Sequence, residues 1–161
     1  MSFDGYLLAK NYAFKLLSFR PRSVEEIKTK LNGYLHKKGF KSILSEKIIG
    51  ELKEQNYLND LEFTKWWIGQ RSNSAIRGVR VIKMELKSKG ISPDIIESVL
   101  NSKSKENETQ KAAKTLEKLL RKLPKSLSSI ELRVKLNNHL LRRGFDFETT
   151  KKAIDEILKK G

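Results

Sequence analysis

Residues 74–90 read SAIRGVRVIKMELKSKG, and this stretch decides how the rest of the chain is interpreted. At helical spacing it divides into an apolar row and a neighbouring basic row. The apolar row holds Val79, Ile82 and Leu86, and the basic row holds Arg80, Lys83 and Lys87. We expect the apolar row to enter a core and the basic row to offer positive charge to a partner. Gly90 ends the stretch, because glycine readily takes the left-handed conformation that stops a helix.

The same pattern occurs three times along the chain. Each copy ends in glycine and carries leucine or isoleucine four and eight residues earlier and serine sixteen residues earlier. The three sets are Ser23, Leu31, Leu35 and Gly39, then Ser74, Ile82, Leu86 and Gly90, then Ser128, Leu136, Leu140 and Gly144. A serine at that position is suited to cap the helix. In the outer copies Glu26 and Glu131 follow three residues later, which completes a predicted capping box.

The middle copy carries Arg77 where the outer copies carry glutamate. A cation in the first turn opposes the helix dipole, at a cost of a few tenths to about 1 kcal/mol. Two explanations are open. Either an exposed turn tolerates the change, or Arg77 extends the basic row toward an acidic ligand.

Each glycine is followed by another apolar stretch of helical spacing, so each copy predicts a unit of three short helices. The sequence therefore predicts an all-α fold of three tandem three-helix, helix-turn-helix-like repeats in an elongated, curved array. We place the repeats at residues 1–57, 58–103 and 104–161. Asn101 through Gln110 contains no apolar residue and is interpreted as a linker between the second and third repeats.

Local signals place several helix ends. Asp4 is expected to cap a first helix that runs to Phe19, and another helix is expected at residues 45–56. Asn59 or Asp60 is expected to begin the next helix, and Ser92-Pro93 a later one. The neighbouring Phe63, Trp66 and Trp67 are interpreted as core, with a recognition surface as the alternative.

The charge balance favours acidic partners without naming one. The 161 residues include 34 lysines and arginines against 19 aspartates and glutamates, a net charge of +15. Such an excess attracts nucleic acids, acidic protein surfaces and anionic membranes. The chain has no cysteine, which excludes disulfides and thiolate chemistry. Because no leader or membrane-length apolar run is evident, we expect a soluble, cytoplasmic protein without membrane attachment.

The sequence offers little for catalysis. His36 and His139 are its only histidines, and neither has a ligand set at metal spacing. The glycines are scattered and form no phosphate-binding loop. We therefore expect neither an enzyme nor a cofactor or metal site, and we interpret both histidines as solvated helix residues.

Several blocks of the first two repeats resemble the RecX family, bacterial regulators of the RecA recombinase. They are RPRS at residues 20–23 with the following glutamates, LKEQNYLND at residues 52–60 with Phe63, and the segment from Arg71 through Gly78 to KGI at residues 89–91. Two departures stand out. Asn56-Tyr57-Leu58-Asn59-Asp60 stands where the family commonly reads GYLDD, and Asn32-Gly33-Tyr34 interrupts the second helix of the first repeat.

The resemblance implies a monomeric protein that binds RecA nucleoprotein filaments in their groove and restrains ATP hydrolysis, strand exchange and coprotease activity. Direct, non-specific contact with single- or double-stranded DNA is a further expectation. The candidate contact residues are Arg71, Arg77, Arg80, Lys83, Lys87, Lys89, Arg142 and Arg143. The alternatives are a DNA- or RNA-binding protein that acts on phosphates alone, and a helical scaffold whose basic face is merely solvated.

Overall fold

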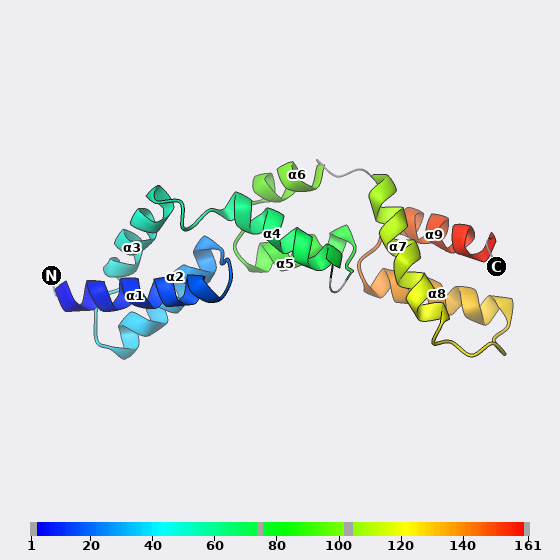
Figure 1. Ribbon diagram of the computed structural model, residues 1–161, viewed down its shortest axis with the longest axis horizontal. Coiled ribbons are helices and arrows are strands. Elements are labelled where there is room, and N and C mark those ends of the chain that lie inside the picture. Colours follow the sequence, from blue (N-terminus) through cyan, green and yellow to red (C-terminus); the bar gives the residue numbers. More distant parts are fainter. Residues whose placement is uncertain (1–2, 74–75, 102–104, 160–161) are drawn as a thin grey trace. The chain divides into compact units, whose positions relative to one another are not determined.

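The computed structural model describes residues 3–73, 76–101 and 105–159, and these residues form helices joined by short turns (Figure 1). The helices are α1 (Phe3–Phe19), α2 (Val24–Lys37), α3 (Ile43–Glu54), α4 (Asp60–Asn73), α5 (Val79–Ser88), α6 (Pro93–Asn101), α7 (Lys105–Leu120), α8 (Ser129–Arg142) and α9 (Phe147–Lys159). The predicted all-α class and the three sets of three helices are confirmed. Within the described ranges no helix is both long and apolar enough to cross a membrane.

The chain divides into two compact units. The N-terminal unit contains Met1–Trp66 and Leu86–Ile96, and the C-terminal unit contains Trp67–Glu85 and Glu97–Gly161. The boundary passes through α4, α5 and α6, so the middle set of helices contributes to both units. Each unit is described by itself below.

In the N-terminal unit, α1, α2 and α3 contact one another around one apolar core (Figure 1). The buried side chains are Ala9, Ala13, Ile27, Leu31, Leu35, Leu44, Ile48, Ile49, Leu52 and Leu58. Leu31 and Leu35 are the positions eight and four residues before Gly39, as the repeat predicts. Tyr34 stacks on Tyr12 with ring centroids 4.5 Å apart, and α2 continues without a break through Gly33. The expected interruption of that helix is therefore wrong.

In the C-terminal unit, α7 packs along α9 and also contacts α8 (Figure 1). Its core consists of Ala112, Leu116, Leu136, Leu140, Phe145, Ala153 and Ile154. Leu136 and Leu140 again precede their glycine by eight and four residues. Ile76, which comes before α5 in the chain, packs against this core. Ile76, which lies between α4 and α5 of the second set of helices, thus extends the core of the third set.

The middle helices bury the predicted apolar row only in part. Ile82 and Leu86 are buried, whereas Val79 is half-buried. Phe63 is buried, with its ring centroid 5.8 Å from that of the half-buried Trp66. Trp67 is also half-buried, so the core interpretation is correct for Phe63 and wrong for the two tryptophans.

The predicted helix caps and helix ends are confirmed at most positions. Both capping boxes form, Ser23 with Glu26 and Ser128 with Glu131. The three repeat glycines have positive φ angles: Gly39 72°, Gly90 75° and Gly144 89°. Asn56 also has a positive φ, 58°, which asparagine tolerates better than most residues. Asn59 caps α4 by accepting from the backbone of Leu61 and Glu62, and α6 begins at Pro93.

Other helix starts differ from expectation. Asp4 lies in the first turn of α1, which already begins at Phe3. Ser45 also lies inside its helix, where it is buried and donates to Asn32 Oδ1 at 2.7 Å. The predicted cap Ser74 lies outside the described residues, but α5 begins only at Val79. Arg77 therefore precedes the helix, and its predicted conflict with the first turn is wrong.

The predicted linker is largely helical. Residues 105–110 belong to α7, while residues 102–104 lie outside the described ranges. The polar composition suits a partly solvated helix, since Glu108 pairs with Lys111 one turn later at 3.0 Å. The linker prediction is therefore wrong for residues 105–110, while its remaining part at residues 102–104 lies outside the described ranges.

Candidate basic interface

The three side chains of the basic row on α5 differ in their bonding partners. Arg80 is exposed, and its Nη2 donates to the carbonyl oxygen of Leu141 at 2.9 Å. Lys83 pairs with Glu97 at 2.6 Å. The side chain of Lys87 is exposed and makes no hydrogen bond or ion pair with the described part of the chain. Within this row, Lys83 is therefore paired with an acid, whereas Arg80 and Lys87 keep their charge available to a partner.

Arg71 is held by neighbours in the C-terminal unit. Its Nε donates to Glu85 at 2.8 Å, and its guanidinium lies 4.5 Å from the ring centroid of Trp67. Trp67 Nε1 donates to the same carboxylate oxygen at 2.8 Å. Since the charge is both paired and stacked, Arg71 orders the surface between α4 and α5.

Lys89 belongs to what we call the N-terminal joint, the contact between the start of α2 and the turn after α5. Ser23 Oγ accepts from the amide of Glu26 at 3.1 Å and donates to the carbonyl of Lys89 at 2.7 Å. Lys89 Nζ donates to Glu26 at 3.0 Å, and Arg20 pairs with the same carboxylate at 2.8 Å. The capping residues of α2 thereby also bind the next repeat.

The electrostatics of the N-terminal joint centre on Glu26. Burial alone would raise the pKa of this carboxyl, but hydrogen bonds from Arg20, Lys89 and the Ser23 amide lower its pKa to about 2, from an ordinary value of 4.5. Glu26 is therefore ionised at neutral pH, and its single negative charge is shared by both cations.

A corresponding C-terminal joint connects the start of α5 with the turn after α8, inside the C-terminal unit. The Gly78 amide donates to the Arg143 carbonyl at 2.8 Å, and the Arg80 amide donates to the Gly144 carbonyl at 3.3 Å. A Cβ at position 78 would overlap the carbonyl group of Gly144. The helix start of α5 is thus capped by carbonyls of the following repeat, which replaces the serine cap we expected.

Two further candidates, Arg142 and Arg143, differ in environment. Arg142 is exposed and donates to the carbonyl of Asn138 at 3.3 Å. Arg143 donates to the carbonyl of Ile76 at 3.2 Å and to His139 Nε2 at 3.0 Å. His139 is half-buried, and burial together with Arg143 and Arg142 lowers its pKa. The expectation of a solvated residue is met by the exposed His36 but is wrong for His139.

Arg77 lies beside the C-terminal joint. Its Nε is buried and has no hydrogen-bond partner. Burial lowers the pKa of Arg143, and the nearby positive charge of Arg77 lowers that pKa further. The structure therefore brings Arg77, Arg80 and Arg143 to one joint, whereas it ties Arg71, Lys83 and Lys89 to acidic partners.

Sequence reasoning missed two surfaces of the C-terminal unit. One is a cavity of about 200 Å³ beside Arg143, whose lining includes Lys118 and Lys122. These lysines are four residues apart, so helical geometry places them on one face, and this spacing could have indicated the cavity. The other is a wider groove of about 530 Å³ where the exposed Val134 and Phe147 meet. Its signal was an apolar residue on an otherwise polar helix face.

Comparison with known proteins accounts for this arrangement. Family models described as the first, second and third three-helix domains of RecX match residues 9–52, 59–100 and 106–154. A Regulatory protein RecX from Prosthecochloris aestuarii is 34% identical over 151 residues, which cover 93% of this chain and 93% of that protein. The chain belongs to the RecX family. Each of the nine helices of the described ranges overlaps one of the three matched domains.

Other RecX proteins are longer. Relatives from Bacillus pumilus and Bacillus subtilis, both called Regulatory protein RecX, are 39% and 36% identical over 94% and 91% of this chain. The chain spans about half, 54%, of the length of each. The crystal structure of RecX from Lactobacillus salivarius superposes with a TM-score of 0.82 at 25% identity, covering 96% of this chain and 97% of that one. A second RecX crystal structure, 22% identical with a TM-score of 0.80, agrees in fold.

Proposed function

We propose that this RecX-family protein restrains the RecA recombinase by binding in the groove of RecA filaments on DNA. It acts as a regulator without catalytic activity or a cofactor, and it lowers ATP hydrolysis, strand exchange and coprotease activity. Membership of the family across all three domains carries the proposal. The setting is the cytoplasm, in recombinational DNA repair and the SOS response, and the protein binds as a monomer.

The repeat architecture supports binding along a filament. We propose repeats at residues 1–57, 58–103 and 104–161, each of which adds a weak contact. Linked weak contacts raise total affinity because later ones form at high effective concentration. The candidate basic residues then serve in two ways: Lys87, Arg142 and Arg80 offer charge at the surface, while Arg71, Lys83 and Lys89 hold the helices that present it.

An apolar groove supports a protein contact in addition to a nucleic-acid contact. Its walls come from α8 and α9, where the side chains of Val134 and Phe147 are 53% and 70% exposed. Arg133 and Lys151 also line it. A phosphate backbone gains little from exposed valine and phenylalanine, but an acidic protein surface with apolar side chains fits both features. We propose a RecA protomer as its occupant.

Direct binding to nucleic acid is the second candidate, and the net charge of +15 favours it. Counterion release gives such a protein affinity for DNA at low salt, and that affinity falls steeply as salt rises. Apolar contacts with RecA are screened much less. The two functions therefore differ in how binding depends on salt.

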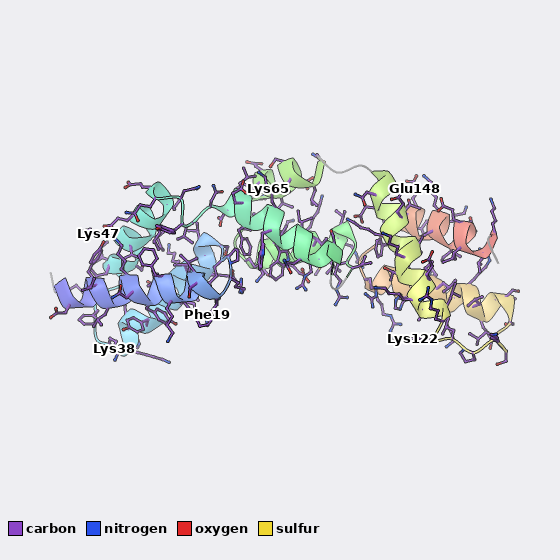
Figure 2. All side chains as sticks on the ribbon, in the orientation of Figure 1. Phe19, Lys38, Lys47, Lys65, Lys122 and Glu148 are labelled. Atoms are coloured by element: carbon purple, nitrogen blue, oxygen red, sulfur yellow. The ribbon has the colours of Figure 1, made fainter. Side chains whose placement is uncertain are left out.

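The test compares bare single-stranded DNA with RecA-coated DNA across salt concentrations. Near physiological salt we expect binding to bare DNA to be weak and binding to RecA-coated DNA to persist. Under the same conditions the protein should lower the rate of ATP hydrolysis by RecA. Phe147→Ala should weaken binding to coated DNA by roughly tenfold, a typical loss for an aromatic contact residue, and leave bare DNA unaffected. The matched control is Phe19→Ala, which removes an equally exposed ring, 73%, from the N-terminal unit (Figure 2).

Equal salt slopes on both substrates, without effect on ATP hydrolysis, would favour the direct nucleic-acid function. Equal losses from Phe147→Ala and Phe19→Ala would reject the groove while leaving filament binding intact.

A further inference from the structure

Two arginines at the C-terminal joint carry positive charge that the described residues do not neutralise. Arg77 has a buried Nε without a hydrogen-bond partner. Arg143 donates to a carbonyl oxygen and to an imidazole nitrogen, both of which are neutral acceptors. A buried cationic donor without an acceptor is unfavourable. An anion bound beside Arg143 would offset the positive charge that these two arginines share.

The cavity beside Arg143 has the shape and charge for such an anion. Its volume is about 200 Å³, and α7, α8 and the segment before α5 provide its walls. The lining residues are Ile76, Thr115, Lys118, Leu119, Lys122, His139 and Arg143, and none of them is acidic. Figure 2 shows Lys122 just beyond the end of α7. The side chains of Lys118 and Lys122 are exposed and make no hydrogen bond or ion pair with any described residue, so both ammonium groups are available to a ligand.

The guanidinium of Arg143 is already oriented before a ligand arrives. Its Nε donates to His139 at 3.0 Å and its Nη1 donates to Ile76 at 3.2 Å, which leaves Nη2 without a partner in the described part of the chain. His139 accepts that bond, which requires an unprotonated Nε2, and the lowered pKa of the imidazole agrees with this. A fixed guanidinium loses little freedom when it binds an oxyanion.

We propose that this cavity binds a phosphate group, held by Arg143, Lys118 and Lys122, while Arg77 adds positive charge near Arg143. A phosphate brings up to two negative charges and several acceptor oxygens, which matches the three lining cations better than the single charge of a carboxylate does. The phosphate belongs either to a nucleic-acid backbone or to a free nucleotide. This site is independent of the RecA contact, because it is built within one unit and needs no filament.

The test uses the whole protein, without RecA, and follows the arginine Nε–H signals by ¹⁵N NMR at constant ionic strength. We expect inorganic phosphate to shift the Arg77 and Arg143 signals in a saturable way. The double variant Lys118→Gln, Lys122→Gln should weaken this binding by roughly tenfold or more, since a charge-assisted hydrogen bond is worth about one decade in affinity. The control Lys114→Gln, Lys125→Gln removes the same charge from exposed lysines outside the cavity lining, and we expect an effect below about twofold because such charges are screened.

Adenosine monophosphate and a short single-stranded oligonucleotide then identify the source of the phosphate. If either compound shifts the same two signals with higher affinity than inorganic phosphate, the site is supported and that compound identifies the source of the phosphate. Unshifted signals in phosphate, or equal losses in the two double variants, would overturn the proposal. The proposal would also be overturned if an oligoglutamate peptide shifted these signals with higher affinity than every phosphate compound, because the site would then recognise carboxylates.

Discussion

The N-terminal and C-terminal joints solve the same structural problem with different chemistry. In each, the start of one second helix meets the turn after the second helix of the next repeat. The N-terminal joint uses side chains: Ser23 and Glu26 bind Lys89. The C-terminal joint uses backbone: amides of Gly78 and Arg80 bind carbonyls beyond α8. One contact is therefore mainly electrostatic and the other depends on close backbone approach.

The difference shows how a helix start is satisfied when its own cap is missing. α2 has a capping box, and the same serine and glutamate also hold the next repeat. No side chain forms such a box for α5 in the described residues, so carbonyls of the following turn accept its first amides. In the middle repeat Arg77 occupies the position that corresponds to Glu26, so this joint lacks the equivalent carboxylate. The surplus of positive charge at the C-terminal joint follows from the same change.

The largest effect should come from closing the space at the C-terminal joint. Gly78→Ala places a Cβ against the backbone of Gly144 and Phe145, which cannot move aside as a side chain would. We expect a loss of about 2–3 kcal/mol in the free energy of unfolding, the range of overpacked core positions, measured by urea denaturation. Gly33→Ala is the control: nothing lies near its Cβ in the interior of α2, so alanine should stabilise by about 0.5–1 kcal/mol. Wild-type stability for Gly78→Ala would show that the joint is not closely packed.

The N-terminal joint should instead fail in acid. The lowered pKa of Glu26, about 2 when folded against 4.5, means that its contribution to stability is complete above pH 4.5 and is lost as pH falls toward 2. The side chain is 18% exposed, and after allowance for solvent screening we expect about 1–2 kcal/mol. Glu26→Gln should remove that amount at neutral pH and flatten the acid dependence between pH 5 and pH 2, measured by thermal unfolding across pH.

Glu131→Gln is the matched control for this change. Glu131 completes the same capping box in α8, and its pKa is lowered by the Ser128 side chain and amide, but it is exposed and bonds neither lysine nor arginine. We expect a smaller change in its acid dependence. Equal changes in the two variants would mean that capping alone, and not the contact with Lys89, accounts for the role of Glu26.

Local signals predicted the fold well. The spacing of Leu31 and Leu35, and of Leu136 and Leu140, identified buried positions because helical geometry alone places them on one face. Gly90 was predicted as a helix stop because few other residues adopt a positive φ without strain.

The candidate site could be predicted only in part. The partners of Ile76 and Gly78 lie in the turn after α8, 67 residues away in the case of Ile76 and Arg143, and no local rule connects such positions. Ion pairs also make some candidate contact residues less available to a partner, since Arg71 pairs with Glu85 and Lys83 pairs with Glu97. A row of basic residues in the sequence predicts where charge lies. It does not predict how much of that charge the folded protein has already used.

The smallest effect should distinguish two lysines near the end of α5 that the sequence treats alike. Lys89 pairs with Glu26, whereas Lys87 is exposed and pairs with no described residue. Lys89→Gln should therefore lower the free energy of unfolding by about 0.5–1 kcal/mol, limited because Arg20 still pairs with Glu26. Lys87→Gln should change it by no more than about 0.3 kcal/mol, as an exposed charge at a helix end does. Both variants lose one charge, so the difference between them isolates the ion pair, and it should shrink in 1 M sodium chloride as screening weakens that pair. Equal losses for the two lysines at low salt would show that net charge, and not the N-terminal joint, sets their contribution.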